Sequence, residues 1–172
     1  MNVPPLDLQK QYKKIKRQIR KRIDEVCDAQ AFVLGKTVTD FEDRFADYCG
    51  AKYAVGCANG TDAILLSLQV AGVSCGDEVL VPSFTFIASA EPVARLGAVP
   101  VFCDIDPRTY NIDPFLLEKK ITSKTKAVIV VHLYGQTANM KPITRLARKY
   151  KLKVIEDACQ AIGAVYGPSG NK

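Results

Sequence analysis

A short polar segment at residues 58–63 has the composition of an anion-binding turn. It reads Ala-Asn-Gly-Thr-Asp-Ala and precedes an apolar stretch with helical spacing. Gly60 allows a ligand to approach the backbone, Thr61 adds a hydroxyl, and the first N–H groups of a helix attract a phosphate. A plain helix N-cap formed by Asn59 or Thr61 explains the segment equally well. The segment matches neither the dinucleotide fingerprint nor the Walker A loop, which disfavours a dinucleotide or ATP site.

Residues 81–88 place aromatic rings where a second apolar run ends. The segment reads Val-Pro-Ser-Phe-Thr-Phe-Ile-Ala. An aromatic ring at the end of a strand can stack on a planar ligand. A lone aromatic side chain usually packs in the core instead, so this segment alone does not establish a ring-binding site.

Residues 154–161 carry two adjacent carboxylates after another apolar run. Strand alternation puts Glu156 and Asp157 on opposite sides of the chain. A carboxylate here could hold a proton on a heteroaromatic nitrogen, and Gln160 could donate a hydrogen bond to a ring oxygen. The simpler interpretation is a helix N-cap beside a surface charge.

The three segments together supply a phosphate site, an aromatic ring and a carboxylate, which are the contacts that pyridoxal phosphate requires. His132, the single histidine, follows a further apolar run. No nucleophile pairs with it in the sequence, so a structural role is the favoured interpretation.

Alternating strand and helix patterns predict the elements that would position these residues. The strand candidates are Lys52–Gly56, Glu78–Val81, Val99–Asp104, Ala127–Val131 and Lys153–Glu156. The helix candidates are Thr61–Ala71, Ala88–Leu96, a short helix capped by Asp113 and begun by Pro114, and Lys141–Tyr150. This order predicts a three-layer α/β/α fold with a mostly parallel sheet. Ligands of such sheets bind beyond the carboxyl ends of the strands.

The N-terminal region is basic and accounts for much of the formal net charge of +6. Residues 10–22 hold Lys10 and seven further lysines and arginines, with Ile15 and Ile19 at helical spacing. A solvated face on a packed helix is the favoured interpretation. Attraction for nucleic acid or for a nucleotide diphosphate is the alternative.

The remaining composition excludes several classes of protein. No run of 18 apolar residues is present and the first residues lack a secretory h-region, so neither a membrane span nor a signal peptide is expected. The six cysteines form no C-x-x-C pair and mostly stand in apolar stretches, which predicts buried, reduced thiols in a cytoplasmic protein. With one histidine, a metal site is not expected.

The sequence resembles the DegT/DnrJ/EryC1/StrS family of sugar aminotransferases, which share the aspartate-aminotransferase fold. Six segments in the family's order carry the resemblance, at residues 3–8, 32–35, 58–63, 82–86, 131–136 and 156–161. The resemblance implies that residues 1–35 form an N-terminal basic helical segment. It implies that residues 36–172 form part of the large domain that binds pyridoxal phosphate. It also implies that the small C-terminal domain is absent.

The resemblance assigns roles to six residues. Gly60, Thr61 and Asp62 would lie at the cofactor phosphate, mostly through their backbone groups. The other three residues would contact the pyridine ring of the cofactor. Phe86 would stack on the ring, Asp157 would pair with the ring nitrogen, and Gln160 would donate a hydrogen bond to the ring hydroxyl oxygen. Asp157 would then control the ring as an electron sink.

By the same resemblance, the protein transfers an amino group, from glutamate, to a keto group of a nucleotide-linked sugar. It would act in the cytoplasm as a homodimer, and its products would enter polysaccharides, glycans or antibiotics. Ile162 departs from the family, which usually has histidine there. The family's Schiff-base lysine is absent, because Lys172 lacks its aromatic-rich context, so we expect no normal activity from these residues alone.

Two alternatives stay open. A dehydratase of the same fold replaces the Schiff-base lysine with histidine. A non-catalytic regulator or remnant domain would bind cofactor, sugar nucleotide or DNA, and the basic helix is its only support.

Overall fold

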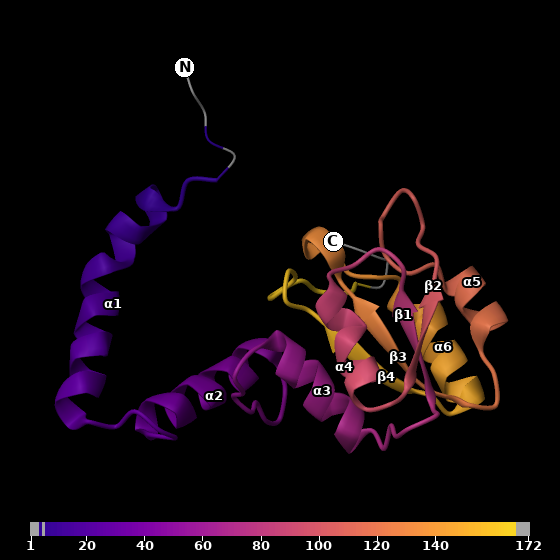
Figure 1. Cartoon of the computed structure of the whole chain (residues 1–172). Helices are drawn as coiled ribbons and strands as arrows, with labels where there is room; N and C mark the ends of the chain where they lie inside the picture. Colours follow the sequence, from indigo (N-terminus) through magenta and orange to yellow (C-terminus); the bar gives the residue numbers. More distant parts are fainter. Residues whose placement is uncertain (1–3, 5, 168–172) are drawn as a thin grey trace. The chain divides into compact units, whose positions relative to one another are not determined.

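A computed structural model describes residues 4 and 6–167 of the chain (Figure 1). Part of the segment at residues 3–8, and Lys172, lie outside the described residues. The chain divides into two compact units, Met1–Gly56 and Cys57–Lys172, and each is described by itself. None of the described helices is long and apolar enough to cross a membrane.

The second unit is built on a four-stranded sheet in the order β2-β1-β3-β4. All three strand pairs are parallel. The strands are β1 (Glu78–Pro82), β2 (Val99–Cys103), β3 (Thr125–Val131) and β4 (Lys153–Asp157). The β-branched runs at these positions fit a sheet that is buried on both faces, and four of the five predicted strands are confirmed.

Helices cover both faces of this sheet, which confirms the three-layer prediction. Val79, Val81 and Ile129 pack on one face with apolar residues of α3 (Gly60–Val70) and α4 (Glu91–Arg95). Leu80 and Val128 pack on the other face with residues of α5 (Pro114–Leu117) and α6 (Met140–Tyr150). Short 3₁₀ turns complete the unit at η1 (Ile87–Ser89), η2 (Glu118–Lys120) and η3 (Leu133–Gly135).

Two predicted elements differ from the structure. Residues 52–56 form no strand, and the N–H group of Gly56 donates to the Glu42 carboxylate at 2.6 Å instead of to a neighbouring strand. The helix predicted over 88–96 is split at Ala90 into η1 and α4. Pro92 is the reason, because its ring nitrogen cannot donate to the carbonyl of Ala88 and its ring crowds that carbonyl.

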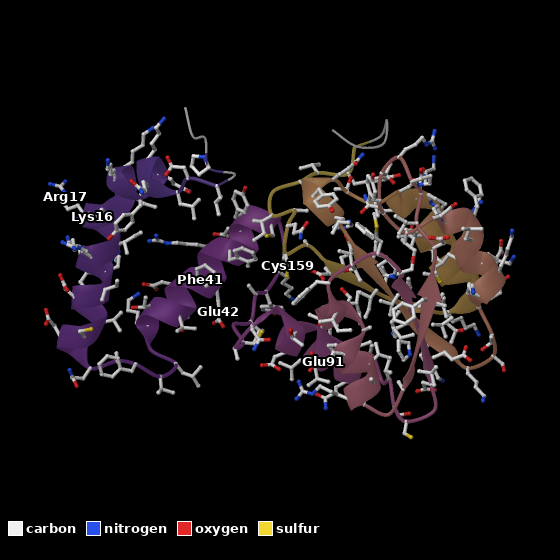
Figure 2. The ribbon with its side chains drawn as sticks, turned by 45° about the horizontal axis from the view of Figure 1, so that its top comes forward. Lys16, Arg17, Phe41, Glu42, Glu91 and Cys159 are labelled. Atoms are coloured by element: carbon white, nitrogen blue, oxygen red, sulfur yellow. The ribbon has the colours of Figure 1, made fainter. Side chains whose placement is uncertain are left out.

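The first unit holds the predicted basic helix as α1 (Gln9–Ala29), followed by α2 (Lys36–Cys49). Lys16 and Arg17 extend from α1 as exposed side chains (Figure 2). None of the α1 residues is buried, and α2 buries Ala46 alone. The two helices therefore keep their apolar residues largely accessible.

The cysteines correct a second expectation. All six are free thiols, but only Cys103 is buried, and the prediction of buried thiols is wrong for the other five. Burial raises the pKa of the Cys103 thiol to about 11. An apolar neighbourhood in sequence did not indicate burial, because the exposed cysteines lie in α1, α2 and loops rather than in the buried strands.

Candidate functional site

A cavity of about 290 Å³ opens at the carboxyl ends of β1, β3 and β4. The chain leaves β1 on one side toward β2 and returns on the other side as β3, so the cavity lies beside the topological switch point of the sheet. Its lining combines residues from four segments, namely Gly60, Thr61, Ile64, Thr85, Phe86, Ala88, Ser89, Val131, Leu133, Asp157, Cys159 and Gln160.

The amino end of α3 forms one wall of the cavity. Asn59 is the N-cap, and its side-chain oxygen accepts from the N–H group of Asp62 at 2.9 Å. The N–H groups of Gly60 and Thr61 belong to the first turn and have no acceptor within the helix. This end of α3 therefore offers two backbone donors and the positive end of the helix dipole to an anion.

Gly60 also sets the distance between α3 and the segment after β4. A Cβ atom added to Gly60 would lie 3.1 Å from the Sγ atom of Cys159. A side chain at position 60 would therefore require the Cys159 side chain to shift by a few tenths of an ångström. The contact joins two walls of the cavity that are far apart in the sequence.

The opposite wall comes from the turn after β1. Phe86 is 74% exposed and lines the cavity. Behind it, the hydroxyl groups of Thr85 and the buried Ser89 lie 3.0 Å apart. The wall thus offers an accessible aromatic face beside a pair of hydroxyl groups.

Asp157 ends β4 and lies on the floor of the cavity. Its Oδ1 atom accepts from the N–H group of Cys159 at 3.2 Å. A hydrogen bond to the Asp157 carboxylate, together with partial burial, raises the pKa of the Cys159 thiol. Cys159 therefore stays protonated at neutral pH, and Asp157 is the acidic group that lines the cavity.

Gln160 completes the floor. Its Oε1 atom accepts from the N–H group of Tyr134 at 2.8 Å. Since only the oxygen of an amide side chain can accept, this bond leaves the NH₂ group as the donor of Gln160.

Glu156 lies on the side of β4 away from Asp157, as strand alternation predicts, and there it meets His132, which follows β3. The Nε2 atom of His132 is 2.9 Å from the Glu156 carboxylate, and its Nδ1 atom accepts from the N–H group of Ala138 at 3.1 Å. His132 is 5% exposed and does not line the cavity. These contacts give the histidine a structural role, as expected from the sequence.

Five of the six residues singled out in the sequence, all but Asp62, line the cavity. The N–H group of Asp62 is taken by the Asn59 cap, and its carboxylate accepts from the Asn59 amide at 3.0 Å. A contact of Asp62 with a ligand stays a prediction. Sequence reasoning did not single out Ser89 or Cys159 as lining residues. The only signal for Ser89 is its spacing of four residues from Thr85, the residue with which its hydroxyl group pairs.

The chemical groups of the lining match those that a phosphorylated planar ring requires. Backbone donors face an anion, an aromatic ring is available for stacking, and a carboxylate and an amide NH₂ group lie beyond it. Pyridoxal phosphate combines these features. No group of three or more histidine, cysteine or acidic side chains suited to a metal ion occurs within residues 4 and 6–167.

Comparison with protein families matches residues 13–170 to the DegT/DnrJ/EryC1/StrS aminotransferase family. The chain belongs to this family. Among curated members, it is 54% identical to a pleiotropic regulatory protein of Geobacillus stearothermophilus over 96% of this chain and 45% of that protein. It is 53% identical to UDP-2-acetamido-2-deoxy-3-oxo-D-glucuronate aminotransferase of Pseudomonas aeruginosa over 94% of this chain and 45% of that enzyme. The chain thus spans about half the length of these DegT/DnrJ/EryC1/StrS relatives.

Two solved structures share the fold. The structure of S. venezuelae DesV in complex with a ketimine intermediate has a TM-score of 0.93 and 42% identity, over 95% of this chain and 44% of DesV. The E. coli GDP-4-keto-6-deoxy-D-mannose-3-dehydratase with bound hydrated PLP has a TM-score of 0.81 and 32% identity, over 87% of this chain and 40% of that enzyme.

Proposed function

We propose that the whole protein is a pyridoxal-phosphate-dependent aminotransferase that moves an amino group, from glutamate, to a keto group of a nucleotide-linked sugar. The observation that carries the proposal is the cavity, which gathers Gly60, Thr61, Phe86, Asp157 and Gln160 from separate elements. The names of the relatives support the substrate class, since the Pseudomonas enzyme acts on a UDP-linked keto sugar.

Each lining residue has a defined task in this proposal. The first N–H groups of α3 bind the phosphate, and Phe86 covers a face of the ring. Gln160 donates its free NH₂ group to the ring hydroxyl oxygen. Asp157 keeps a proton on the ring nitrogen, and Cys159 holds its carboxylate in place through a backbone N–H group. The bound cofactor supplies an electron sink for the group transfer.

The test uses the complete protein and a matched pair of aspartates at strand ends. Asp157→Ala removes the acid from the cavity, and a loss of turnover on the order of 10³-fold is expected, as for the loss of one decisive polar group in other active sites. Asp104→Ala is the control, because Asp104 follows β2 and binds Ser83 and the N–H group of Ile105 outside the cavity. Wild-type turnover in Asp157→Ala would contradict the proposal.

A sugar dehydratase is the second candidate, and the similarity to the E. coli dehydratase supports it. The residue at the position of the family's Schiff-base lysine decides between the two reactions. A lysine in an aromatic-rich segment favours the aminotransferase, and a histidine at that place favours the dehydratase. Sequencing of the complete gene and assay of both reactions distinguish them.

The proposal includes a cytoplasmic homodimer that serves polysaccharide, glycan or antibiotic synthesis. Exposed apolar side chains of α1, including Ile15, Ile19 and Ile23, support an assembly that covers them. The formal net charge of +6 is compatible with a diphosphate substrate. Light scattering of the complete protein tests the dimer, and a monomer at micromolar concentration would contradict it.

A further inference from the structure

The Gln160 side chain is oriented by the turn that follows β3. Its Oε1 atom accepts from the N–H group of Tyr134 at 2.8 Å. Its backbone carbonyl oxygen lies 3.3 Å from the place that a Cβ atom of Gly135 would occupy. The direction of the Gln160 amide therefore depends on where Tyr134 and Gly135 lie.

This turn has a strained backbone. Tyr134 adopts φ 57° and ψ 23°, and Gly135 adopts φ 83°. The left-handed conformation costs a residue with a Cβ atom roughly 1–2 kcal/mol. Such a conformation persists only where the surrounding structure holds it.

Asn111 holds both ends of the turn with one side chain. Its Oδ1 atom accepts from the N–H group of Leu133 at 3.0 Å, and its Nδ2 atom donates to the carbonyl of Gln136 at 3.1 Å. Asn111 is 3% exposed, so water does not compete for these bonds. The preceding residue adds a second contact, because the ring of Tyr110 meets the ring of Tyr134 edge-on at 6.1 Å.

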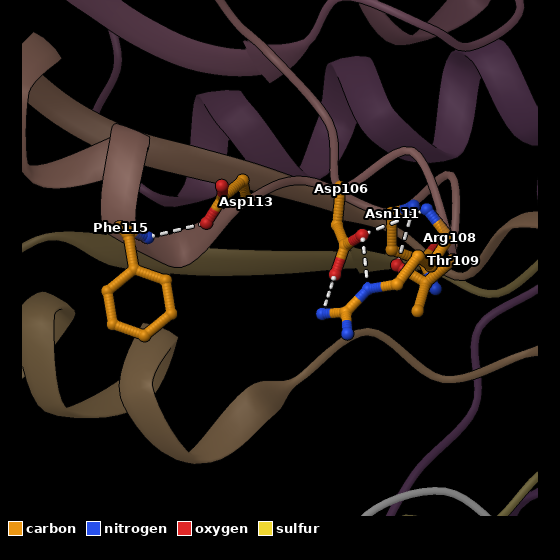
Figure 3. A network of polar contacts seen from close by, with 6 residues as sticks. All are labelled: Asp106, Arg108, Thr109, Asn111, Asp113 and Phe115. Atoms are coloured by element: carbon orange, nitrogen blue, oxygen red, sulfur yellow. Dashed lines mark hydrogen bonds and ion pairs between the residues drawn. The ribbon is translucent and has the colours of Figure 1, made fainter.

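The loop that carries Asn111 is itself fixed by polar contacts (Figure 3). The Asp106 carboxylate accepts from the backbone N–H group of Arg108 at 2.9 Å and from its guanidinium at 3.0 Å. The N–H group of Asp106 donates to the carbonyl of Asn111, and the N–H group of Tyr110 donates to the carbonyl of Asp106. Asn111 therefore braces the turn from a loop that is already ordered.

We propose that Asn111 is a positioning residue for the cofactor, which acts through the Tyr134–Gly135 turn on the Gln160 amide. The inference rests on the proposed function, since it assumes that Gln160 donates to the ring hydroxyl oxygen. Asn111 makes no contact with the cavity, which separates its role from that of the lining residues.

A double-mutant cycle in the complete protein tests this role. Asn111→Ala, Gln160→Ala and the double variant are titrated with pyridoxal phosphate, and the absorption spectrum of the bound cofactor is recorded. Each single change is expected to lower affinity about tenfold, which corresponds to the loss of one hydrogen bond to a charged or polarised group. The double variant is expected to match Gln160→Ala alone, because residues that act through one another are not additive.

Two further variants keep the test decisive. Asn139→Ala is the matched control, because Asn139 is a nearby amide that binds the Tyr166 hydroxyl at 2.9 Å and does not contact the turn. It is expected to leave affinity and spectrum unchanged. Gly135→Ala replaces Asn111→Ala if the latter does not fold, since a Cβ atom there strains the same turn and presses on Gln160.

The outcomes separate the inference from the proposed function. Additive losses, or an unchanged spectrum in Asn111→Ala beside a changed one in Gln160→Ala, overturn the role of Asn111 and leave the cofactor site intact. An unchanged spectrum in Gln160→Ala overturns the assigned role of Gln160 and the inference with it. Faster hydrogen exchange of residues 133–137 in Asn111→Ala, with the non-additive pattern, supports the inference.

Discussion

The two units of the chain contrast in how their apolar residues are used. Ile129 of β3 is fully buried between two layers of helices, whereas Ile19 of α1 is 38% exposed. Both residues stand in segments with clear apolar patterns, so the pattern alone does not tell a packed element from an unpacked one. The cavity lies wholly in the unit whose strands pair and pack, because long-range pairing is what fixes side chains from distant segments in one place.

Charge is distributed differently as well. The acidic partners of α1 are few, and Lys21 and Arg22 pair with Glu25 on the same helix at exposed positions. Pairs of this kind contribute only a few tenths of a kcal/mol. In the second unit, His132 links neighbouring parallel strands through Glu156. The basic charge of α1 is thus largely unpaired within its own helix, while the His132–Glu156 pair links two strands of the sheet.

The largest expected effect compares one truncation in each unit. Ile129→Ala leaves a cavity in the packed core and is expected to lower the free energy of unfolding by about 2–5 kcal/mol. Ile19→Ala is expected to lower it by less than about 1 kcal/mol, because its side chain is already accessible. Urea unfolding followed by circular dichroism measures both. A cost of about 2 kcal/mol or more for Ile19→Ala would show that another surface covers α1 in the whole protein.

An intermediate effect is expected where two segments of the second unit touch. Gly60→Ala places a Cβ atom 3.1 Å from the Cys159 Sγ atom and is expected to displace this side chain of the cavity lining, so affinity for pyridoxal phosphate is expected to fall about tenfold. Cys159→Ala removes the sulfur and is expected to restore most of the affinity in the double variant. Ser67→Ala within α3 is the control, since its hydroxyl only binds the carbonyl of Ala63. Failure of Cys159→Ala to rescue Gly60→Ala would rule out this contact as the cause.

The smallest expected effect is a pH dependence. The hydrogen bond from His132 lowers the pKa of the Glu156 carboxyl below its ordinary value of 4.5. The resulting stability is present above that value and is lost as the pH falls through the lower, folded pKa. Its size is below about 1 kcal/mol because the carboxylate is half-exposed.

Glu156→Gln is expected to flatten this acid limb in a series of urea unfolding curves from pH 5 downward. Asp40 of α2 offers the comparison, since a hydrogen bond from Lys36 also lowers its pKa, but the Lys36 side chain is 85% exposed whereas that of His132 is 6% exposed. Asp40→Asn is expected to leave the acid limb unchanged. Equal effects of the two variants would show that the buried His132 partner adds nothing to the pairing.

Much of the second unit could be predicted from its sequence. The strands stand out because buried parallel strands are continuous apolar runs, and the site segments stand out because each follows such a run. Asn59, Gly60 and Asp157 were recognisable because turn chemistry and strand ends leave local signatures. The resemblance to one family then assigned Gly60 and Asp157 their expected partners on the cofactor.

The residues that could not be predicted act over long distances in the chain. Asn111 contacts residues 22 and 25 positions away, and nothing in its own segment indicates which turn it binds. The strand predicted at 52–56 failed for the same reason, since an extended run needs a partner that the local pattern does not reveal. Cysteine exposure likewise depends on packing between elements rather than on the neighbours in sequence.

The contact of Gly60 with Cys159 has a consequence for synthesis of the chain. The two walls of the cavity are separated by about a hundred residues, and β4 follows β1, β2 and β3 in the chain. The amino end of α3 therefore leaves the ribosome first and stays solvated on that side until the segment after β4 is made. A ligand that contacts both walls can therefore be bound only after β4 has been translated.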